Sequence, residues 1–287
     1  MALPEIEQLL KKAMGLDSQS IGSPTVERAV ESRQRALRIA DAQVYWDKVS
    51  TDEAELQELI EAVVVPETWF FRDREAFAAL AGTVLPEWLR SHPGGVMRLL
   101  SLPCSSGEEP FSIAMALLDA GLAPERFAID AVDISARALE IAQRGLYSPN
   151  SFRGEVLGFR DRHFEPTPHG HKVSDAVRQQ VRFRQGNIFS PNAGELYDVV
   201  FCRNLLIYFD RPVQDRAVKV IEKMLTAKGF LFVGPSETSL LGSHNFTSAR
   251  WPLAFAFRKG VVPVAKPAAP PRAAARPAPR PAPKPVR

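Results

Sequence analysis

Apolar and polar residues recur with a helical period through the first part of the chain. Three segments carry the pattern, and they are PEIEQLLKKAMG ending at Gly15, SPTVERAVESRQRALRIA from Ser23, and the stretch from Asp52 to Val65. Ser23 and Pro24 suit the cap and the first turn of a helix. We therefore predict that residues 4 to 64 are helical.

After residue 96 the pattern changes to short apolar runs separated by helical segments. The runs predict strands, and they are the run ending at Leu100, Phe127 to Val132, VRFRQG from Val181, Val199 to Cys202, GFLFVGPSE from Gly229, and Trp251 to Phe257. Intervening helices are predicted for SARALEIAQRG, with Ser135 as its cap and Gly145 as its end, and from Pro212 to Leu225. This alternation predicts an α/β fold with a parallel sheet, whose ligand lies at the carboxyl ends of the strands.

Two stretches break the alternation. Residues 146 to 182 are rich in turn formers and predict an inserted subdomain or a lid. Residues 261 to 287 contain nine prolines and predict an extended, disordered linker or tail. We therefore expect a helical part over residues 1 to 66, an α/β domain over 67 to 258 that contains the insert, and a disordered part over 259 to 287.

A turn with two carboxylates follows the first predicted strand, in LLSLPCSSGEEPFSIAMA. Ser105, Ser106 and Gly107 permit a tight turn, and Glu108 and Glu109 fall in the first turn of the next helix, where acidic groups suit the helix dipole. A dinucleotide fingerprint would place glycines and free N–H groups here, whereas carboxylates repel a pyrophosphate. The turn therefore favours a cationic or hydroxyl-rich ligand, with Glu108 facing it and Glu109 stabilising the helix start.

Polar residues follow several of the predicted strands at this same edge of the sheet. The candidates are Glu108, Asp133, Asn187, Ile188, Arg203 and Asn204. A carboxylate at the position of Asp133 commonly accepts both ribose hydroxyls of an adenosine ligand. Asn187 and Ile188 would flank the base by hydrogen bonding and by packing. A ribose with a cationic group and no phosphate describes S-adenosylmethionine (SAM).

Composition limits the partners, the cellular compartment and the metal binding that we expect for this protein. The formal net charge is +3, but residues 261 to 287 hold six basic groups and no acidic one, which leaves −3 for residues 1 to 260 and gives no warrant for nucleic-acid binding. Cys104 and Cys202 are too few for a disulfide framework, so we expect reduced thiols in the cytoplasm. No apolar run reaches membrane-spanning length, so we expect no membrane insertion. His169 and His171 lack a third ligand, so we expect no metal.

Two arginine-containing patterns leave alternatives open. Three consecutive aromatic residues precede Arg72 in ETWFFRDREAF, where they would either pack in the core or hold the guanidinium at a site. On the second predicted helix, Arg28, Arg35 and Arg38 lie about a turn or two apart, with Arg33 to one side. The helix face that carries these arginines is either solvated or a docking surface for an acidic helix.

Five motifs together resemble those of the CheR family, the chemoreceptor glutamate methyltransferases. They are PETWFFRD, SSGEEPFSIAMAL, AVDIS, GNIF and FCRNLLIYF, and the resemblance covers about residues 5 to 258. It implies a helical N-terminal domain and a Rossmann-like SAM-dependent methyltransferase domain with a small inserted antiparallel β-subdomain. It further implies transfer of a methyl group to glutamate side chains of a chemoreceptor's cytoplasmic helices, with S-adenosylhomocysteine (SAH) as the product.

The resemblance also implies roles for single residues. The implied cofactor pocket consists of Thr68, Arg72, Glu108, Asp133, Asn187, Ile188, Arg203 and Asn204. Arg72 and Tyr208 are implied to lie nearest the reacting groups. Arg33, Arg35 and Arg38 resemble the basic positions that face the receptor. The loop HFEPTPHGHKVSD is shorter than that of relatives that bind a receptor's C-terminal pentapeptide, which counts against such a tether. The tail resembles the proline-rich linker that precedes tetratricopeptide repeats in surface-sensing relatives.

Three rival functions remain on the residues alone. The first is a methyltransferase that acts on a small acid or on a different protein. The second is a non-catalytic adaptor that binds a receptor or SAH. The third, an oxidoreductase, is disfavoured because the nucleotide turn lacks the glycine pattern of a dinucleotide site.

Overall fold

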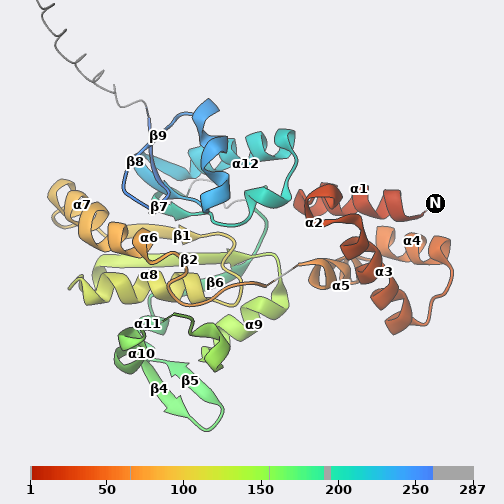
Figure 1. Ribbon diagram of the computed structural model, residues 1–287, viewed down its shortest axis with the longest axis horizontal. Helices are drawn as coiled ribbons and strands as arrows, with labels where there is room; N and C mark the ends of the chain where they lie inside the picture. Colours follow the sequence, from red (N-terminus) through yellow and green to blue (C-terminus); the bar gives the residue numbers. More distant parts are fainter. Residues whose placement is uncertain (1, 65, 155, 191–194, 261–287) are drawn as a thin grey trace, which may run out of the picture.

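A computed structural model describes residues 2–64, 66–154, 156–190 and 195–260 of the chain. The predicted tail from residue 261 onward lies outside the described residues. The N-terminal part is helical, as predicted, and its helices are α1 (Ala2–Met14), α2 (Ser18–Ile21), α3 (Ser23–Leu37), α4 (Ala42–Thr51) and α5 (Glu53–Val63) (Figure 1). They enclose a core of their own, in which Tyr45, Val26 and Leu59 are fully buried.

Two details of this helical part differ from the prediction. Helix α4 was not among the three segments with clear helical periodicity, and it begins where the Asp41 carboxylate accepts hydrogen bonds from two backbone N–H groups. The cap of α3 is Gly22 rather than Ser23, because Ser23 already has helical geometry and Pro24 follows in the first turn.

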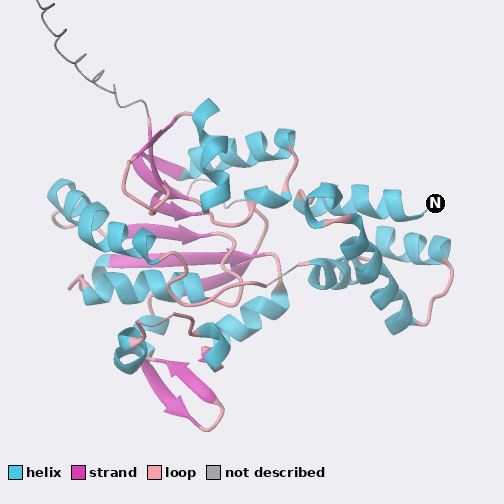
Figure 2. Ribbon diagram, viewed as in Figure 1, coloured by secondary structure: helices cyan, strands magenta, loops and turns pink. Residues whose placement is uncertain are grey.

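A seven-stranded sheet forms the centre of the α/β part, in the order β6-β2-β1-β7-β8-β10-β9. The strands are β1 (Met97–Ser101), β2 (Phe127–Asp133), β6 (Val181–Gln185), β7 (Tyr197–Phe201), β8 (Leu225–Phe232), β9 (Phe246–Ser248) and β10 (Ala256–Lys259). The strands from β6 to β8 are parallel to their neighbours, whereas β10 is antiparallel to both β8 and β9. Figure 2 shows the parallel strands pointing toward the N-terminal helices.

The predicted parallel sheet is confirmed from β6 to β8, and the difference lies in the last strand, which was predicted for residues 251 to 257. Strand β10 begins only at Ala256, and β9 was not predicted. Arg250, Leu253 and Phe255 have left-handed backbone angles, with φ of 59°, 57° and 49°, which a strand cannot accommodate. The chain turns on itself through these residues and returns antiparallel.

Helices cover both faces of the sheet. One face packs against α6 (Arg74–Ala79), α7 (Leu85–Ser91), α8 (Glu108–Asp119) and α9 (Ala136–Arg144), and the other against α12 (Arg211–Met224). Neighbouring residues of β1 point to opposite faces, so that Leu99 belongs to the first core and Leu100 to the second. Burial on both faces explains why these strands are continuous apolar runs.

The insert contains a small antiparallel sheet, as the family resemblance implies. Its order is β3-β5-β4, with β3 (Leu146–Tyr147), β4 (Phe164–Thr167) and β5 (Gly170–Val173). Short helices α10 (Gly158–His163) and α11 (Asp175–Arg178) flank these strands. The boundaries predicted for the domains and for the insert remain predictions.

Phe70 joins the insert to the rest of the fold. Its buried ring stacks on Phe152 at 5.2 Å and meets Tyr147 and Phe164 edge-on at 4.8 and 4.9 Å. Phe70 therefore packs in the core with Phe71 against it, whereas the ring of the half-buried Trp69 lies 4.5 Å from the Arg72 guanidinium carbon.

None of the helices in the described ranges combines the length and the apolar character that a bilayer span requires.

Candidate active site

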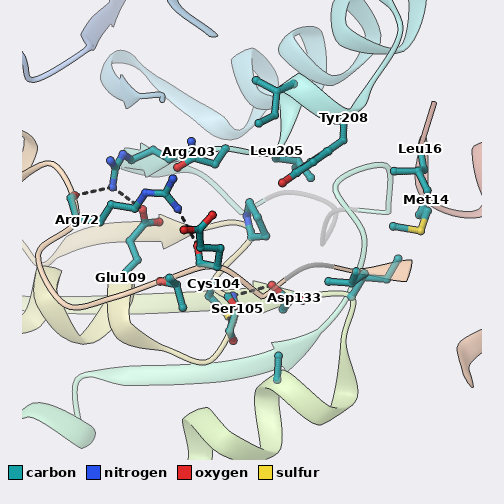
Figure 3. A pocket seen from close by; sticks show the side chains of 18 of the residues that line it. Met14, Leu16, Arg72, Cys104, Ser105, Glu109, Asp133, Arg203, Leu205 and Tyr208 are labelled. Atoms are coloured by element: carbon teal, nitrogen blue, oxygen red, sulfur yellow. Dashed lines mark hydrogen bonds and ion pairs between the residues drawn. The ribbon is translucent and has the colours of Figure 1, made fainter. Parts of the chain in front are cut away.

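A cavity of about 250 Å³ lies at the carboxyl ends of the parallel strands, where the N-terminal helices meet the sheet. Figure 3 shows Arg72, Glu109 and Arg203 on one side of it and Met14 and Leu16 on the other. The cavity thus has a charged end and an apolar end. A ligand with both a zwitterionic and an aromatic part matches this division.

Arg203 is the centre of the charged end. Its side chain is 2% exposed and contacts the Glu109 carboxylate at 3.2 Å, the Asp73 carboxylate, and the backbone carbonyl of Arg72 at 3.1 Å. Its Nε is buried without a partner among the described residues. Burial raises the pKa of Glu109, while the charge of Arg203 and hydrogen bonds from Ser101 and Arg203 act in the opposite direction.

Three loops around the cavity contain residues with left-handed backbone angles. Phe71 and Asp73, on either side of Arg72, have φ of 56° and 54°, and Ser105 and Asn204 have 47° and 58°. Such angles are costly for residues other than glycine and tend to cluster at functional sites, where surrounding contacts maintain them. They turn the backbone sharply at the edge of the cavity.

Asp133, at the end of β2, is held in the cavity wall by two backbone donors. Its carboxylate accepts from the N–H of Ser105 at 2.7 Å and of Ser135 at 2.9 Å. Burial raises its pKa, and these two hydrogen bonds oppose the shift. An ionised carboxylate has about four acceptor positions, so it can still accept from a ligand. The nearby Ser105 Oγ is buried without a partner in the described chain.

Tyr208 projects into the cavity from a short 3-10 turn, Leu206–Tyr208, as Figure 3 shows. A fully buried carboxylate, Glu237, holds the loop before it, accepting from the N–H groups of Gly234 at 2.6 Å, Leu206 at 2.7 Å and Asn204 at 3.0 Å. Burial raises the pKa of Glu237 despite these donors. Sequence reasoning missed this residue, although a carboxylate directly after the apolar GFLFVGPS run was a signal.

Most of the predicted pocket residues do line the cavity. They are Thr68, Arg72, Asp133, Arg203, Asn204 and Tyr208. The adjacent carboxylates differ from the expectation, because Glu109 lines the cavity and Glu108 does not. Successive residues of a helix point about 100° apart, so that one of the two must turn away.

Glu108 faces the insert instead. It is buried and accepts hydrogen bonds from Ser106 Oγ at 2.7 Å and Ser151 Oγ at 2.9 Å. Burial raises its pKa, and both hydrogen bonds oppose the shift. Gly107, with φ of 95°, makes the turn before it, as the sequence predicts; an added Cβ there would lie 2.8 Å from Ala142 Cβ.

Asn187 and Ile188 also lie outside the main cavity. They line a separate cavity of about 50 Å³. The Asn187 amide donates to the carbonyl of Ala13 at 2.5 Å and accepts from the N–H of Phe189 at 3.0 Å. The side chain thus ties the end of α1 to the sheet, rather than pointing toward the cavity.

The N-terminal helices form part of the cavity wall, which sequence reasoning did not anticipate. Met14 and Leu16 line its apolar end. Glu61 accepts from the N–H of Ala136 at 2.7 Å at the start of α9, and the N–H of Asp17 donates to the carbonyl of Tyr208 at 2.8 Å. In the sequence, only the apolar residues at the end of α1 could have indicated that the N-terminal helices line the cavity.

Arg33 is not available for docking, contrary to the prediction for this helix. Its side chain is 17% exposed and makes two hydrogen bonds to Glu55, at 2.8 and 3.0 Å, and one to Glu58 at 2.9 Å. Arg35 is 72% exposed and Arg38 is also exposed. Of the three predicted docking residues, Arg35 on α3 and Arg38 at its C-cap reach solvent, whereas Arg33 does not.

The cysteines and histidines singled out in the sequence lie outside any metal site within the described residues. Cys104 and Cys202 are free and buried, and burial raises the pKa of both thiols. Across the described ranges, no three His, Cys, Asp or Glu side chains gather closely enough to hold a metal ion. His169 is exposed, whereas His171 packs at 5.1 Å from the ring of Phe152.

Five parallel strands, followed by an antiparallel β10 and by β9 at the edge, with a ligand cavity at the carboxyl ends of the parallel strands, form the fold of the SAM-dependent methyltransferases. Residues 66–251 match the SAM-binding domain of the CheR methyltransferases, and residues 1–64 match their all-alpha domain. The chain belongs to the CheR methyltransferase family. The predicted family and the predicted cofactor are thereby confirmed.

Three relatives place the chain within this family. It is 52% identical over 257 residues to the probable biofilm formation methyltransferase WspC of Pseudomonas aeruginosa, covering 88% of this chain and 61% of that protein. It is 46% identical over 253 residues to WspC of Pseudomonas putida, covering 87% and 60%. Chemotaxis protein methyltransferase 2 of Vibrio cholerae is 38% identical over 192 residues, covering 64% and 66%. The chain thus spans about three fifths of the length of its WspC relatives.

Proposed function

We propose that this protein transfers the methyl group of SAM to glutamate side-chain carboxylates of chemoreceptor cytoplasmic helices, in the cytoplasm. The products are glutamate methyl esters and SAH. The observation that carries the proposal is the charged end of the cavity, where Arg72, Arg203 and Glu109 surround a space that Tyr208 enters. Its family membership and its relatives named as chemotaxis and biofilm formation methyltransferases support a chemosensory role.

The cavity residues match the chemical groups of SAM. Asp133 would accept from the ribose hydroxyls, Glu109 would bind the ammonium group, and the unpartnered Nε of Arg203 would donate to the carboxylate. The apolar end around Met14 and Leu16 would receive the adenine ring. In this proposal Glu108 does not contact the cofactor and instead stabilises the turn before α8 through its hydrogen bonds with Ser106 and Ser151.

The acceptor glutamate has to be aligned with the methyl group of SAM, and it does not have to lose a proton. A glutamate with an ordinary pKa of about 4.3 is already ionised at neutral pH, so no general base is needed. Bound SAM supplies an electrophilic methyl group on a sulfonium. Arg72 and Tyr208 would orient the acceptor carboxylate and replace its water shell, and correct alignment can lower the barrier by about 7 to 11 kcal/mol.

The direct test is incubation with SAM carrying a radiolabelled methyl group and with cytoplasmic fragments of candidate receptors. We expect label in the receptor fragment that mild base releases as methanol, as methyl esters require. Label that resists base would contradict the glutamate assignment. Tight SAH binding without any turnover would favour the adaptor instead.

The two adjacent carboxylates provide a matched pair of variants. Glu109→Gln is expected to weaken SAH binding about tenfold, because an amide cannot form the charge-assisted hydrogen bond to an ammonium group. Glu108→Gln is expected to leave SAH affinity unchanged and to lower the melting temperature, since its partners are Ser106 and Ser151. Titration calorimetry and thermal unfolding of both variants distinguish these effects. Weaker SAH binding in Glu108→Gln, with unchanged binding in Glu109→Gln, would show that Glu108 binds the cofactor.

SAH affinity should also depend on pH in the acidic range. Burial raises the pKa of Asp133 and of Glu109, so both take up protons at higher pH than exposed carboxyls. The ligand requires the ionised forms, so affinity is full above the raised pKa values and is lost as the pH falls through them. Calorimetry at stepwise lower pH, starting from neutral pH, should show this decline. Glu109→Gln should decline less steeply, and constant affinity would exclude the assignment.

Arg35 in α3 and Arg38, which caps the end of this helix, are the proposed receptor-docking residues. Arg35→Glu with Arg38→Glu is expected to raise the KM for a receptor fragment about tenfold, with kcat unchanged, because charges at an interface rim act mainly on association. Arg33→Ala serves as the contrast. It should lower stability by breaking the pairs with Glu55 and Glu58, leaving KM unaltered in the folded protein. An unchanged KM in the double variant would show that the receptor does not dock on Arg35 and Arg38.

A further inference from the structure

We propose that Arg153, from the inserted segment, binds a second carboxylate of the acceptor, one helical turn from the glutamate that is methylated. The acceptor would then be an acidic helix that presents two carboxylates on one face. This inference rests on the proposed function and extends it, because it assigns a specificity-determining residue outside the residues that line the cavity.

Arg153 and Arg72 share one aromatic ring. The guanidinium carbon of each lies 4.5 Å from the centre of the Trp69 ring. Trp69 and Arg72 both line the cavity, and the side chain of Arg153 is 50% exposed beside them. A second arginine therefore packs on the same ring as the one proposed to orient the acceptor.

The backbone that carries Arg153 is firmly attached to the site. The carbonyl of Ser151 accepts from the N–H of Phe70 at 2.9 Å, and the Ser151 hydroxyl donates to the buried Glu108 carboxylate at 2.9 Å. The ring of Phe152 stacks on that of Phe70. The insert thus holds the arginine at a defined place although its side chain reaches solvent.

The present anionic partner of Arg153 is easily displaced. The Glu67 carboxylate lies 3.5 Å from the Arg153 guanidinium and is 60% exposed, and exposed pairs of this kind contribute little to stability. The Glu67 backbone carbonyl accepts from Arg72 at 2.7 Å, so only its side chain is free to move away. Two cations held near one ring attract an anion from outside, and an acceptor carboxylate can replace that of Glu67.

The spacing favours a helical acceptor. Because both guanidinium carbons lie 4.5 Å from the same point, they can be no more than 9.0 Å apart. Side chains four residues apart on a helix have Cβ atoms about 5–6 Å apart. One carboxylate can therefore meet Arg72 at the cavity while its neighbour meets Arg153.

Two helical peptides with a single glutamate test this inference. One carries Asp four residues before and after the glutamate, and the other carries Asn at both places. Binding of the fluorescently labelled peptides to the SAH-bound protein gives their affinity ratio, and methyl transfer is measured separately. We expect the wild type to bind the Asp peptide about tenfold more tightly, and Arg153→Ala to reduce the ratio to near one with SAH affinity unchanged.

Matched variants complete the design. Arg153→Lys should keep part of the preference, and Arg144→Ala, which removes an exposed arginine from the end of α9, should keep all of it. A ratio that survives in Arg153→Ala, or that is near one in the wild type, would overturn the inference. Preferential binding without methyl transfer would instead contradict the proposed function and leave the assignment of Arg153 standing.

Discussion

Arg203→Ala is expected to lower the free energy of unfolding by about 3–5 kcal/mol and to abolish measurable SAH binding. Removal of one partner from a buried ion pair leaves the other charge uncompensated, which is the costly case for such pairs. Here the orphaned groups would be the carboxylates of Glu109 and Asp73. Urea denaturation measures the first effect and calorimetry the second.

A double variant separates stability from function at this position. Arg203→Met with Glu109→Gln removes the charge of Arg203 and that of its more buried partner and leaves only the more exposed Asp73, so it should regain part of the stability that Arg203→Ala loses. It should not regain SAH binding, because neither a guanidinium nor a carboxylate is left for the ligand. A loss below about 1 kcal/mol in Arg203→Ala would show that water reaches the site and replaces the arginine.

Tyr208→Phe is expected to lower kcat about 100-fold and to leave the dissociation constant of SAH unchanged. The phenol would hold the acceptor carboxylate in line with the methyl group, and a misplacement of the reacting atoms by about 1 Å can cost about 10² in kcat. Single-turnover kinetics with a receptor fragment measures the chemical step. The ring itself remains, so the packing of Tyr208 against the N-terminal helices is kept.

A tyrosine far from the cavity provides the control for this change. The Tyr197 hydroxyl donates to Asp130 and Glu195 at the other end of the sheet. Tyr197→Phe should therefore reduce stability and preserve kcat. Unchanged kcat in Tyr208→Phe would remove its proposed role and leave orientation of the acceptor to Arg72.

Periodicity in the sequence was sufficient for the main elements of the fold. Short apolar runs identified β1, β2, β7 and β8 because both faces of these strands are largely buried, whereas β6, at the edge of the sheet, is only partly buried and contains two arginines. It failed at the last edge, where left-handed residues from Arg250 to Phe255 reverse the chain. Nothing in a hydrophobic pattern shows the sign of φ at these positions.

The candidate site was predicted less completely than the fold. Strand ends brought Asp133, Arg203 and Asn204 to one edge, since parallel strands share a direction. Adjacent residues such as Glu108 and Glu109 cannot be separated by sequence alone, because the rotation of a helix about its axis is set by packing. The same holds for Arg33, whose partners Glu55 and Glu58 lie on a different helix.

By itself, the sequence determined the alternation of strands and helices, the carboxylate-rich turn after the first strand, and the motifs that identify the family. Only the tertiary structure decided which carboxylate enters the cavity, that Glu237 holds the Tyr208 loop, and that Arg153 stands beside Arg72. The reason is physical. Local patterns reflect backbone preferences and burial, whereas these contacts join residues distant in the chain, whose meeting depends on how the packed elements are oriented.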